Sequence, residues 1–203
     1  MTTSLVRASW SAVAQPPLLI VTGLAVLMTL ATVPFLDAGN AHQVRTGVAA
    51  LLACALASCA EDPAGEVAAA SPEARRVRCG ARLALGLVLV LPVAVASLAL
   101  TEHQVPGIET RGVAVQMLAL LSVGPAVGFA VWAWVDLAQP TYTAMAGVLC
   151  VVLVMLILPS GWAVIKFQPW GPPFEAILIR WFALALLGAA IVAACWRDPL
   201  TNR

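Results

Sequence analysis

Charged side chains are scarce in this sequence, and their scarcity excludes a water-soluble globular protein. Only 10% of the 203 residues are Asp, Glu, Lys or Arg, whereas 62% are hydrophobic. A soluble domain usually carries about 25% charged residues. The apolar residues instead form runs close to the length that crosses a bilayer core. The net charge of +1, with no run of basic residues interleaved with aromatics, indicates no nucleic-acid partner.

Motifs that bind nucleotides or carry out hydrolysis are absent as well. The sequence has no Gly-x-x-x-x-Gly-Lys-Ser/Thr phosphate loop, no Gly-x-Ser-x-Gly elbow and no His-Glu-x-x-His pair. Carboxylates, which mark ion or proton paths in membranes, are missing from the centres of the apolar runs, and the nearest, Asp136, falls at the end of the fourth run. The five cysteines show neither a disulfide framework nor metal-ligand spacing. We therefore expect a chain that is not itself an enzyme and binds no cofactor or metal.

The apolar runs predict an all-α integral membrane protein, a single transmembrane domain over residues 1–203. The six expected spans are Leu18–Phe35, Val44–Ala60, Ala81–Leu100, Gly112–Trp134, Thr143–Trp162 and Ala176–Trp196. The second span is short and rich in Ala, and small residues let helices approach closely. Between the first two spans, Asp37 to Arg45 is expected to form a polar connection with a turn at Gly39-Asn40.

Residues 1–15 have the pattern of a helix lying in the membrane interface before the first span. One sector of the helical wheel is apolar and includes Trp10, and the opposite sector is polar and includes Arg7. Pro16-Pro17 would then turn the chain into the membrane. A frayed N-terminal tail is the alternative.

Basic residues are unequally distributed between the two ends of the spans, which predicts that both termini are cytoplasmic. With six spans and the N-terminus inside, the inner side holds Arg7, Arg75, Arg76, Arg78, Arg82, Arg197 and Arg203. The outer side holds Arg45, Arg111, Lys166 and Arg180. Ten Arg against one Lys, with abundant Ala, Val and Leu, suggest GC-rich coding. The expected location is therefore a bacterial plasma membrane.

The longest polar stretch, Glu61–Arg78, separates its opposite charges. The acidic residues come first and the basic ones last: Glu61, Asp62 and Glu66, then Arg75, Arg76 and Arg78. Gly65 helps to end the second helix, and Ser71-Pro72 predicts a capped start for a helix that runs past Arg82 into span three. These features favour a docking element for a soluble partner. An ordinary cytoplasmic loop whose arginines set the topology is the alternative.

The connection after span five, Pro159–Glu175, mixes apolar and aromatic residues with helix breakers. The notable positions are Pro159, Gly161, Trp162, Trp170 and Glu175, with further prolines at 169, 172 and 173. A water-exposed loop would be more polar. We therefore expect a half-buried hairpin that re-enters the outer leaflet, since irregular backbone at that depth is tolerated when it is buried in protein or lines a cavity. A surface loop anchored by Trp is the alternative.

With these segments in this order, the chain resembles the permease subunit of a type 2 ABC exporter. Such subunits have an interfacial elbow helix, six spans with both ends inside, a cytoplasmic coupling helix after span two and short re-entrant helices after span five. Met1–Gln15, Glu61–Arg78 and Pro159–Glu175 stand in those places. Within the coupling loop, the family pattern matches Glu61, Gly65, Ser71, Pro72, Arg75 and Arg76. The chain departs from the family in its short length, its short second span and Glu66, where a Thr usually follows the Gly.

The resemblance implies transport that this chain cannot perform alone. A separate ATP-binding cassette subunit, which carries ATP and Mg, would dock on the coupling loop. Two permease chains, identical or different, would form the path between them, lined by spans one, two and five. The exported cargo would be hydrophobic: a peptide, an antibiotic, a lipid or a glycan.

Two functions of other classes fit the same sequence. A structural or assembly subunit of a membrane complex would use the charged loop only to bind its partner and would carry no transport path. A small membrane enzyme or haem-binding protein would use His42 and His103 in the outer connections, together with Asp37 and Glu109.

Overall fold

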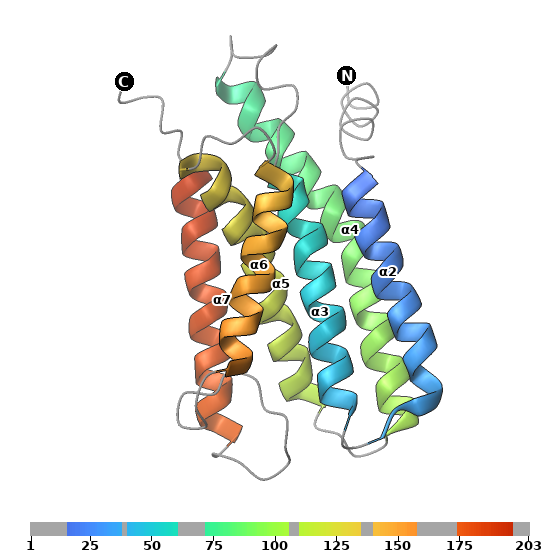
Figure 1. Ribbon diagram of the computed structural model, residues 1–203. Helices are drawn as coiled ribbons and strands as arrows, with labels where there is room; N and C mark the ends of the chain where they lie inside the picture. The colour runs from blue at the N-terminus through green and yellow to red at the C-terminus, as the bar shows by residue number, and fades with distance from the viewer. Residues whose placement is uncertain are drawn as a thin grey trace.

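The computed structural model describes residues 16–37, 40–60, 72–105, 110–134, 140–157 and 174–196. These residues form helices and short turns, and no strand occurs among them (Figure 1). The elements are α2 (Pro16–Thr32) with the 3-10 turn η1 (Val33–Phe35), α3 (Ala41–Ala57) with the 3-10 turn η2 (Ser58–Ala60), α4 (Pro72–Gln104), α5 (Thr110–Trp134), α6 (Pro140–Ile157) and α7 (Phe174–Trp196). Six of the described helices are long and apolar enough to cross a membrane. For the described residues, the prediction of an all-α chain with six helices able to span a membrane is confirmed.

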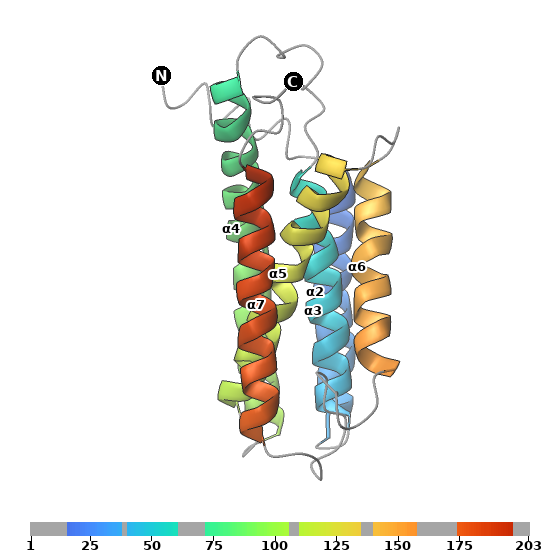
Figure 2. The same cartoon turned by 90° about the vertical axis from the view of Figure 1, so that its left-hand side faces the viewer.

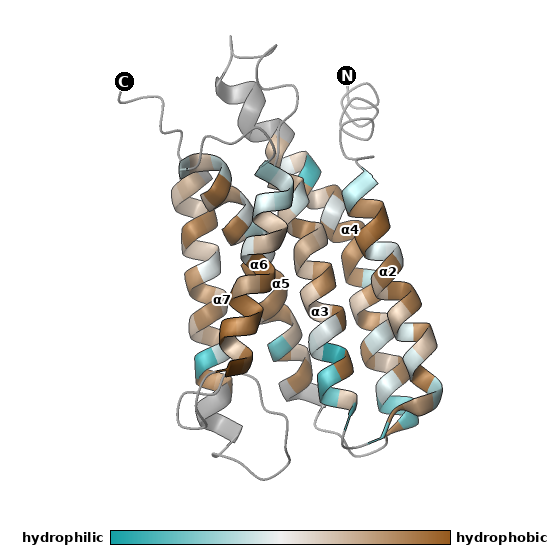
Figure 3. Ribbon diagram, viewed as in Figure 1, coloured by the Kyte–Doolittle hydropathy of each residue, from teal (hydrophilic) through white to brown (hydrophobic). Residues whose placement is uncertain are grey.

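The six helices run alternately up and down, so α2 begins and α7 ends at the same end of the bundle (Figure 1). We call this end the Pro16 end and the opposite one the Ala41 end. Hydrophobic residues cover the middle of every helix, and hydrophilic residues gather toward the helix ends, including the start of α3 (Figure 3). This distribution is the one that a bilayer imposes, because its hydrocarbon core cannot solvate polar groups.

The core of the bundle lies along α3 and α5. Helix α3 packs against α2, α4, α5 and α6, and α5 packs in addition against α7. Leu52 and Leu56 of α3 are fully buried, whereas Leu27 of α2, Leu153 of α6 and Leu186 of α7 are more than half exposed. The outer helices therefore present apolar surface of the kind that lipid covers.

A seam of small residues brings α3 and α5 into direct backbone contact. A Cβ added to Gly124 would collide with the backbone of Ala53, and one added to Gly128 would lie 2.6 Å from the carbonyl oxygen of Ala57. Both pairs are four residues apart along their helices. The arrangement is the small-x-x-x-small packing of membrane helices, in which van der Waals contact between backbones replaces the hydrophobic effect.

Helix α4 is longer than the bilayer is thick. Its 33 residues span about 50 Å at 1.5 Å per residue, against about 30 Å of hydrocarbon. Its apolar part covers Cys79–Gln104, and its first two turns rise above the neighbouring helices at the Pro16 end (Figure 2). The helix that the sequence predicts, starting at Pro72 and running past Arg82 into the third span, is confirmed.

The predicted polar connection from Asp37 to Arg45 is wrong in its second half, because α3 begins at Ala41. The side chains of Asp37 and Asn40 accept hydrogen bonds from each other's backbone N–H at 2.8 and 3.0 Å. This reciprocal pair lies directly before α3, whose N-cap residue is Asn40. Consequently Arg45, predicted where the connection and the second span overlap, is in the second turn of α3.

Candidate functional site

The residues predicted to form the docking loop are only partly described by the structure. The residues of this set outside the described ranges are Glu61, Asp62, Gly65, Glu66 and Ser71. The remaining four, Pro72, Arg75, Arg76 and Arg78, belong to the first turns of α4. The backbone therefore places the basic part of this segment on the projecting end of a helix.

The predicted interfacial and re-entrant segments are not tested. Residues 1–15 and 158–173 lie outside the described residues, and with them Pro159, Gly161, Trp162 and Trp170. Glu175 is the second residue of α7. Span five is described from Pro140 to Ile157, so its predicted continuation to Trp162 stays a prediction.

The structure brings together a polar group that the sequence did not single out, at the Ala41 end of the core. Arg45 and Thr46 of α3 and Gln116 of α5 are 3%, 5% and 6% exposed. Arg45 lies four residues after Ala41, about 6 Å along the helix axis. Ionisable residues inside membrane spans are rare and expensive, and they usually face the bundle interior at functional sites.

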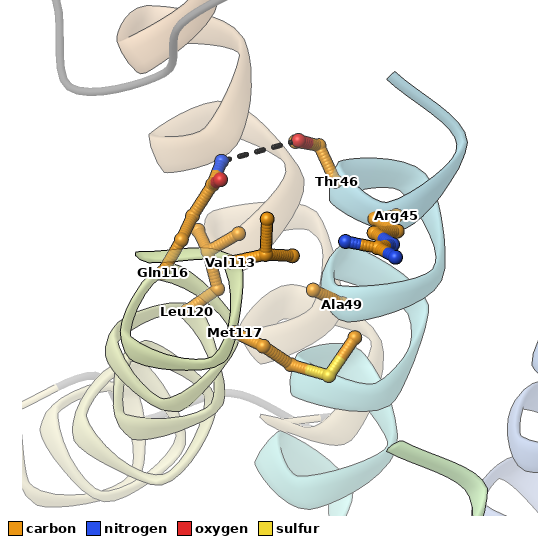
Figure 4. A pocket seen from close by; sticks show the side chains of 7 residues that line it. All are labelled: Arg45, Thr46, Ala49, Val113, Gln116, Met117 and Leu120. Carbon is orange, nitrogen blue, oxygen red and sulfur yellow. Dashed lines mark hydrogen bonds between the residues drawn. The ribbon is translucent and has the colours of Figure 1, made fainter. Parts of the chain in front are cut away.

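A hydrogen bond between helices fixes two members of this group. The Thr46 hydroxyl donates to the carbonyl oxygen of His42 at 2.9 Å, as Ser and Thr commonly do toward the preceding turn of a helix. With its proton so used, Thr46 Oγ1 accepts from Gln116 Nε2 at 3.2 Å (Figure 4). Thr46 therefore orients the side-chain amide of Gln116 toward α3.

Arg45 is the unusual member of the group. All three of its guanidinium nitrogens are buried, and none of them has a hydrogen-bond partner among the described residues. A guanidinium carries a full positive charge at neutral pH and five N–H donors. The carboxylate of Glu102, on the last turn of α4, acts electrostatically on Arg45, but Glu102 itself is exposed. The buried charge is thus compensated only across a distance.

A small pocket lies beside this charge. It is lined by Arg45, Thr46, Ala49, Val113, Gln116, Met117 and Leu120 (Figure 4). The space open to the centre of a water molecule is about 10 Å³, which is room for about one water-sized body. The pocket places a full charge and the Thr46–Gln116 pair beside a mostly apolar lining.

Other buried polar groups are distributed elsewhere in the bundle. Arg82 of α4 is 2% exposed and acts electrostatically on Cys59 in η2. Ser97 and Thr101 are buried on α4, where the Thr101 hydroxyl donates to the Ser97 carbonyl at 2.8 Å. None of these groups lines the pocket beside Arg45.

The histidines proposed for a metal or haem site lie at helix ends. His42 is in the first turn of α3 and His103 in the last turn of α4, so neither is in a connection as the sequence predicted. Among the residues that the structure describes, no group of three or more His, Cys, Asp or Glu could hold a metal ion. Glu109, the fourth member of that set, lies outside them.

Sequence signals for the arginine pocket exist, although they are weak. Gln116 is an amide inside an otherwise apolar run, and Arg45, Thr46 and Ala49 share one helical face once the helix starts at Ala41. The boundary of α3 was the missing information. Comparison of the chain with protein-family models, with curated proteins and with solved structures finds no match in any of the three.

Proposed function

We propose that this chain is the permease subunit of a type 2 ABC exporter in a bacterial plasma membrane, with both termini cytoplasmic. It would work as a dimer with separate ATP-binding subunits that dock on Glu61–Arg78. The observation that carries the proposal is the projecting start of α4. Its first seven residues, Pro72–Arg78, precede the apolar span, and they include three of the arginines that predict the cytoplasmic side.

The continuity of α4 supports a coupling role. One helix runs from the projecting turns at Pro72 to Gln104 at the far end of the bundle, and it packs against α2, α3 and α5 on the way. A helix transmits displacement along its axis because its hydrogen bonds hold each turn on the next; in α4 Pro92 removes one of these bonds, but the helix continues on both sides of it. Movement of a docked ATPase would therefore reach the core helices and the Ala41 end without an intervening loop.

The arrangement of the outer helices is compatible with pairing of two chains. Exposed apolar side chains run along α2 and α6, for example Ile20, Leu24, Leu149 and Val154. Spans one, two and five, which are expected to line a path, correspond to α2, α3 and α6. Of these, α2 and α6 have exposed surface, whereas α3 is surrounded by other helices of the same chain. We expect a hydrophobic cargo to pass between the α2 and α6 faces of two subunits, with α3 behind them.

The test is purification of the chain from its native membrane in a mild detergent, followed by mass spectrometry of the proteins that accompany it. We expect a stoichiometric subunit with an ATP-binding phosphate loop. Replacing Arg75 and Arg76 by Glu should remove that subunit, because reversed charges at a docking surface repel the partner. The charge-matched control is Arg111→Glu with Lys166→Glu, on the predicted outer side, which should keep it.

Two outcomes would contradict the proposal. A well-preserved complex without any ATPase would favour the structural or assembly subunit. The ATPase could instead stay bound and coupled when Arg75 and Arg76 are replaced by Glu and be lost in the Arg111 and Lys166 control. The docking surface would then lie at the other end of the bundle, and the predicted membrane orientation would be reversed.

A further inference from the structure

We propose that the pocket between α3 and α5 is a binding site for one small anion of halide size, with Arg45 as its principal ligand. The site lies at the Ala41 end of the bundle, away from the projecting start of α4. It is therefore independent of the docking proposal, and neither requires the other.

The first argument is charge compensation. A buried cation without a bound counter-charge is strongly destabilising in a protein interior, and more so within a membrane span. Arg45 is 3% exposed, and no described group forms a hydrogen bond with its guanidinium. Glu102 contributes a favourable but distant field, and its carboxylate is exposed at the helix end. An anion at the guanidinium supplies the missing charge directly.

The second argument is the inventory of donors around the pocket. The guanidinium has five N–H groups, and none of them is used within the part of the chain that the structure describes. The Gln116 amide gives one N–H to Thr46 and has a second one. Thr46 has already donated its own proton to His42, so it orients Gln116 and does not itself donate to the ligand. Apart from the Gln116 carbonyl oxygen, the unused polar groups of the pocket are donors, which suits an anion and not a cation.

The third argument is size. The space beside Arg45 accommodates about one water-sized body. A carboxylate or phosphate group has several heavy atoms and exceeds this space, and α3 and α5, whose backbones are in contact two turns further on, would have to separate for such a group to enter fully. A water molecule fits but leaves the charge uncompensated. A chloride ion, only slightly larger than water, would neutralise it.

The experiment uses the full-length chain in nanodiscs of phosphatidylcholine, which carries no net charge. Chloride binding is measured by equilibrium dialysis with radioactive chloride, and thermal unfolding by tryptophan fluorescence in sodium chloride against sodium gluconate at equal ionic strength. We expect saturable binding of one chloride per chain and a higher unfolding temperature in chloride.

Three variants assign the site. Arg45→Gln should abolish the chloride dependence or weaken binding about ten- to hundredfold, because hydrogen bonds to charged groups are the strong ones. Gln116→Leu keeps the charge and should weaken binding less. Arg82→Gln removes another buried arginine, 2% exposed, outside the pocket, and should leave chloride binding unchanged.

Several results would overturn the proposal. No saturable chloride binding to the unmodified chain would do so, whether or not the variants fold. Binding that is equal in Arg45→Gln, or that is lost only in Arg82→Gln, would place the anion elsewhere. Stabilisation by phosphate or by anionic lipid, without any by chloride, would show that the site takes a larger anionic group and that the size argument is wrong.

Discussion

Replacing Gly124 by alanine probes the contact between the two core helices. The added Cβ would meet the carbonyl oxygen, the carbonyl carbon at 2.9 Å and the Cα at 3.1 Å of Ala53. All three are backbone atoms, so no side chain can rotate away. Ordinary van der Waals contact begins at 3.4 Å, and the carbonyl carbon alone would have to retreat by 0.5 Å, the difference between 3.4 and 2.9 Å. Helices α3 and α5 must therefore separate along their seam.

The expected loss of stability follows from that separation. Overpacking a close contact typically costs about 1–3 kcal/mol, and we expect the upper part of that range because backbone opposes backbone. Gly124 also precedes Pro125, which disfavours the helical conformation for a residue with a Cβ. Gly128→Ala avoids this complication: its Cβ would lie 2.6 Å from the Ala57 carbonyl oxygen. Gly128→Ala should lower the free energy of unfolding by about 2 kcal/mol through packing alone.

Two other glycines serve as graded controls. At Gly47 the added Cβ would lie 2.7 Å from Met28 Cε, the free end of a flexible side chain, so alanine there should cost less than about 1 kcal/mol. At Gly23 no described atom lies within 4 Å. Alanine at that exposed helical position should be neutral or stabilising by at most about 1 kcal/mol, because it favours the helix.

The assay follows reaction of buried thiols with a fluorogenic maleimide as denaturant or temperature rises. Cys54, Cys59 and Cys79 are buried, whereas Cys150 is exposed and Cys195 intermediate, so the last two are changed to Ser in every variant. Reaction of Cys54 and Cys59 reports directly on α3. If Gly124→Ala and Gly128→Ala are as stable as Gly23→Ala, the close contact between α3 and α5 does not determine the stability of this fold.

The remaining predictions concern the core and its polar group. Leu52→Ala in α3 should lower the free energy of unfolding by about 2–4 kcal/mol, because it leaves a cavity. Leu27→Ala on the exposed face of α2 should change it by less than about 0.5 kcal/mol. Similar values for the two variants in the same thiol assay would show that α3 is not the core. Thr46→Val should cost about 1 kcal/mol by breaking the bond to Gln116, and Thr46→Ser, which keeps the hydroxyl, should recover most of it. A valine variant as stable as the parent would mean that this bond contributes nothing.

Much of the fold could be predicted from the sequence because the bilayer makes strong local demands. A span needs about 20 apolar residues, and its backbone must be helical. The runs beginning near Leu18 and ending near Trp196 meet that requirement and became α2 through α7. Ser71-Pro72 also predicted where α4 starts, since proline is favoured in the first turn of a helix.

The start of α3 shows where this reasoning fails. Hydropathy places a helix boundary where polarity begins, so His42 was assigned to a connection and Arg45 to the overlap of that connection with the second span. The helix begins at Ala41, directly after the reciprocal hydrogen bonds of Asp37 and Asn40, so the charge of Arg45 lies within the span. A local interaction of this kind has no signature in the apolar pattern.

The candidate pocket depended still more on tertiary structure. Gly124 and Gly128 have the spacing of a close helix contact, but the sequence does not say which helix they meet. Only the packing of α5 on α3 brings Gln116 to Thr46 and places the guanidinium of Arg45 beside both. The sequence by itself determined that the chain is helical, how many times it can cross a membrane and where its charges fall, because these depend on local composition. Which helix lies at the centre, and which polar groups meet there, was decided by contacts between residues about 70 positions apart, which composition does not encode.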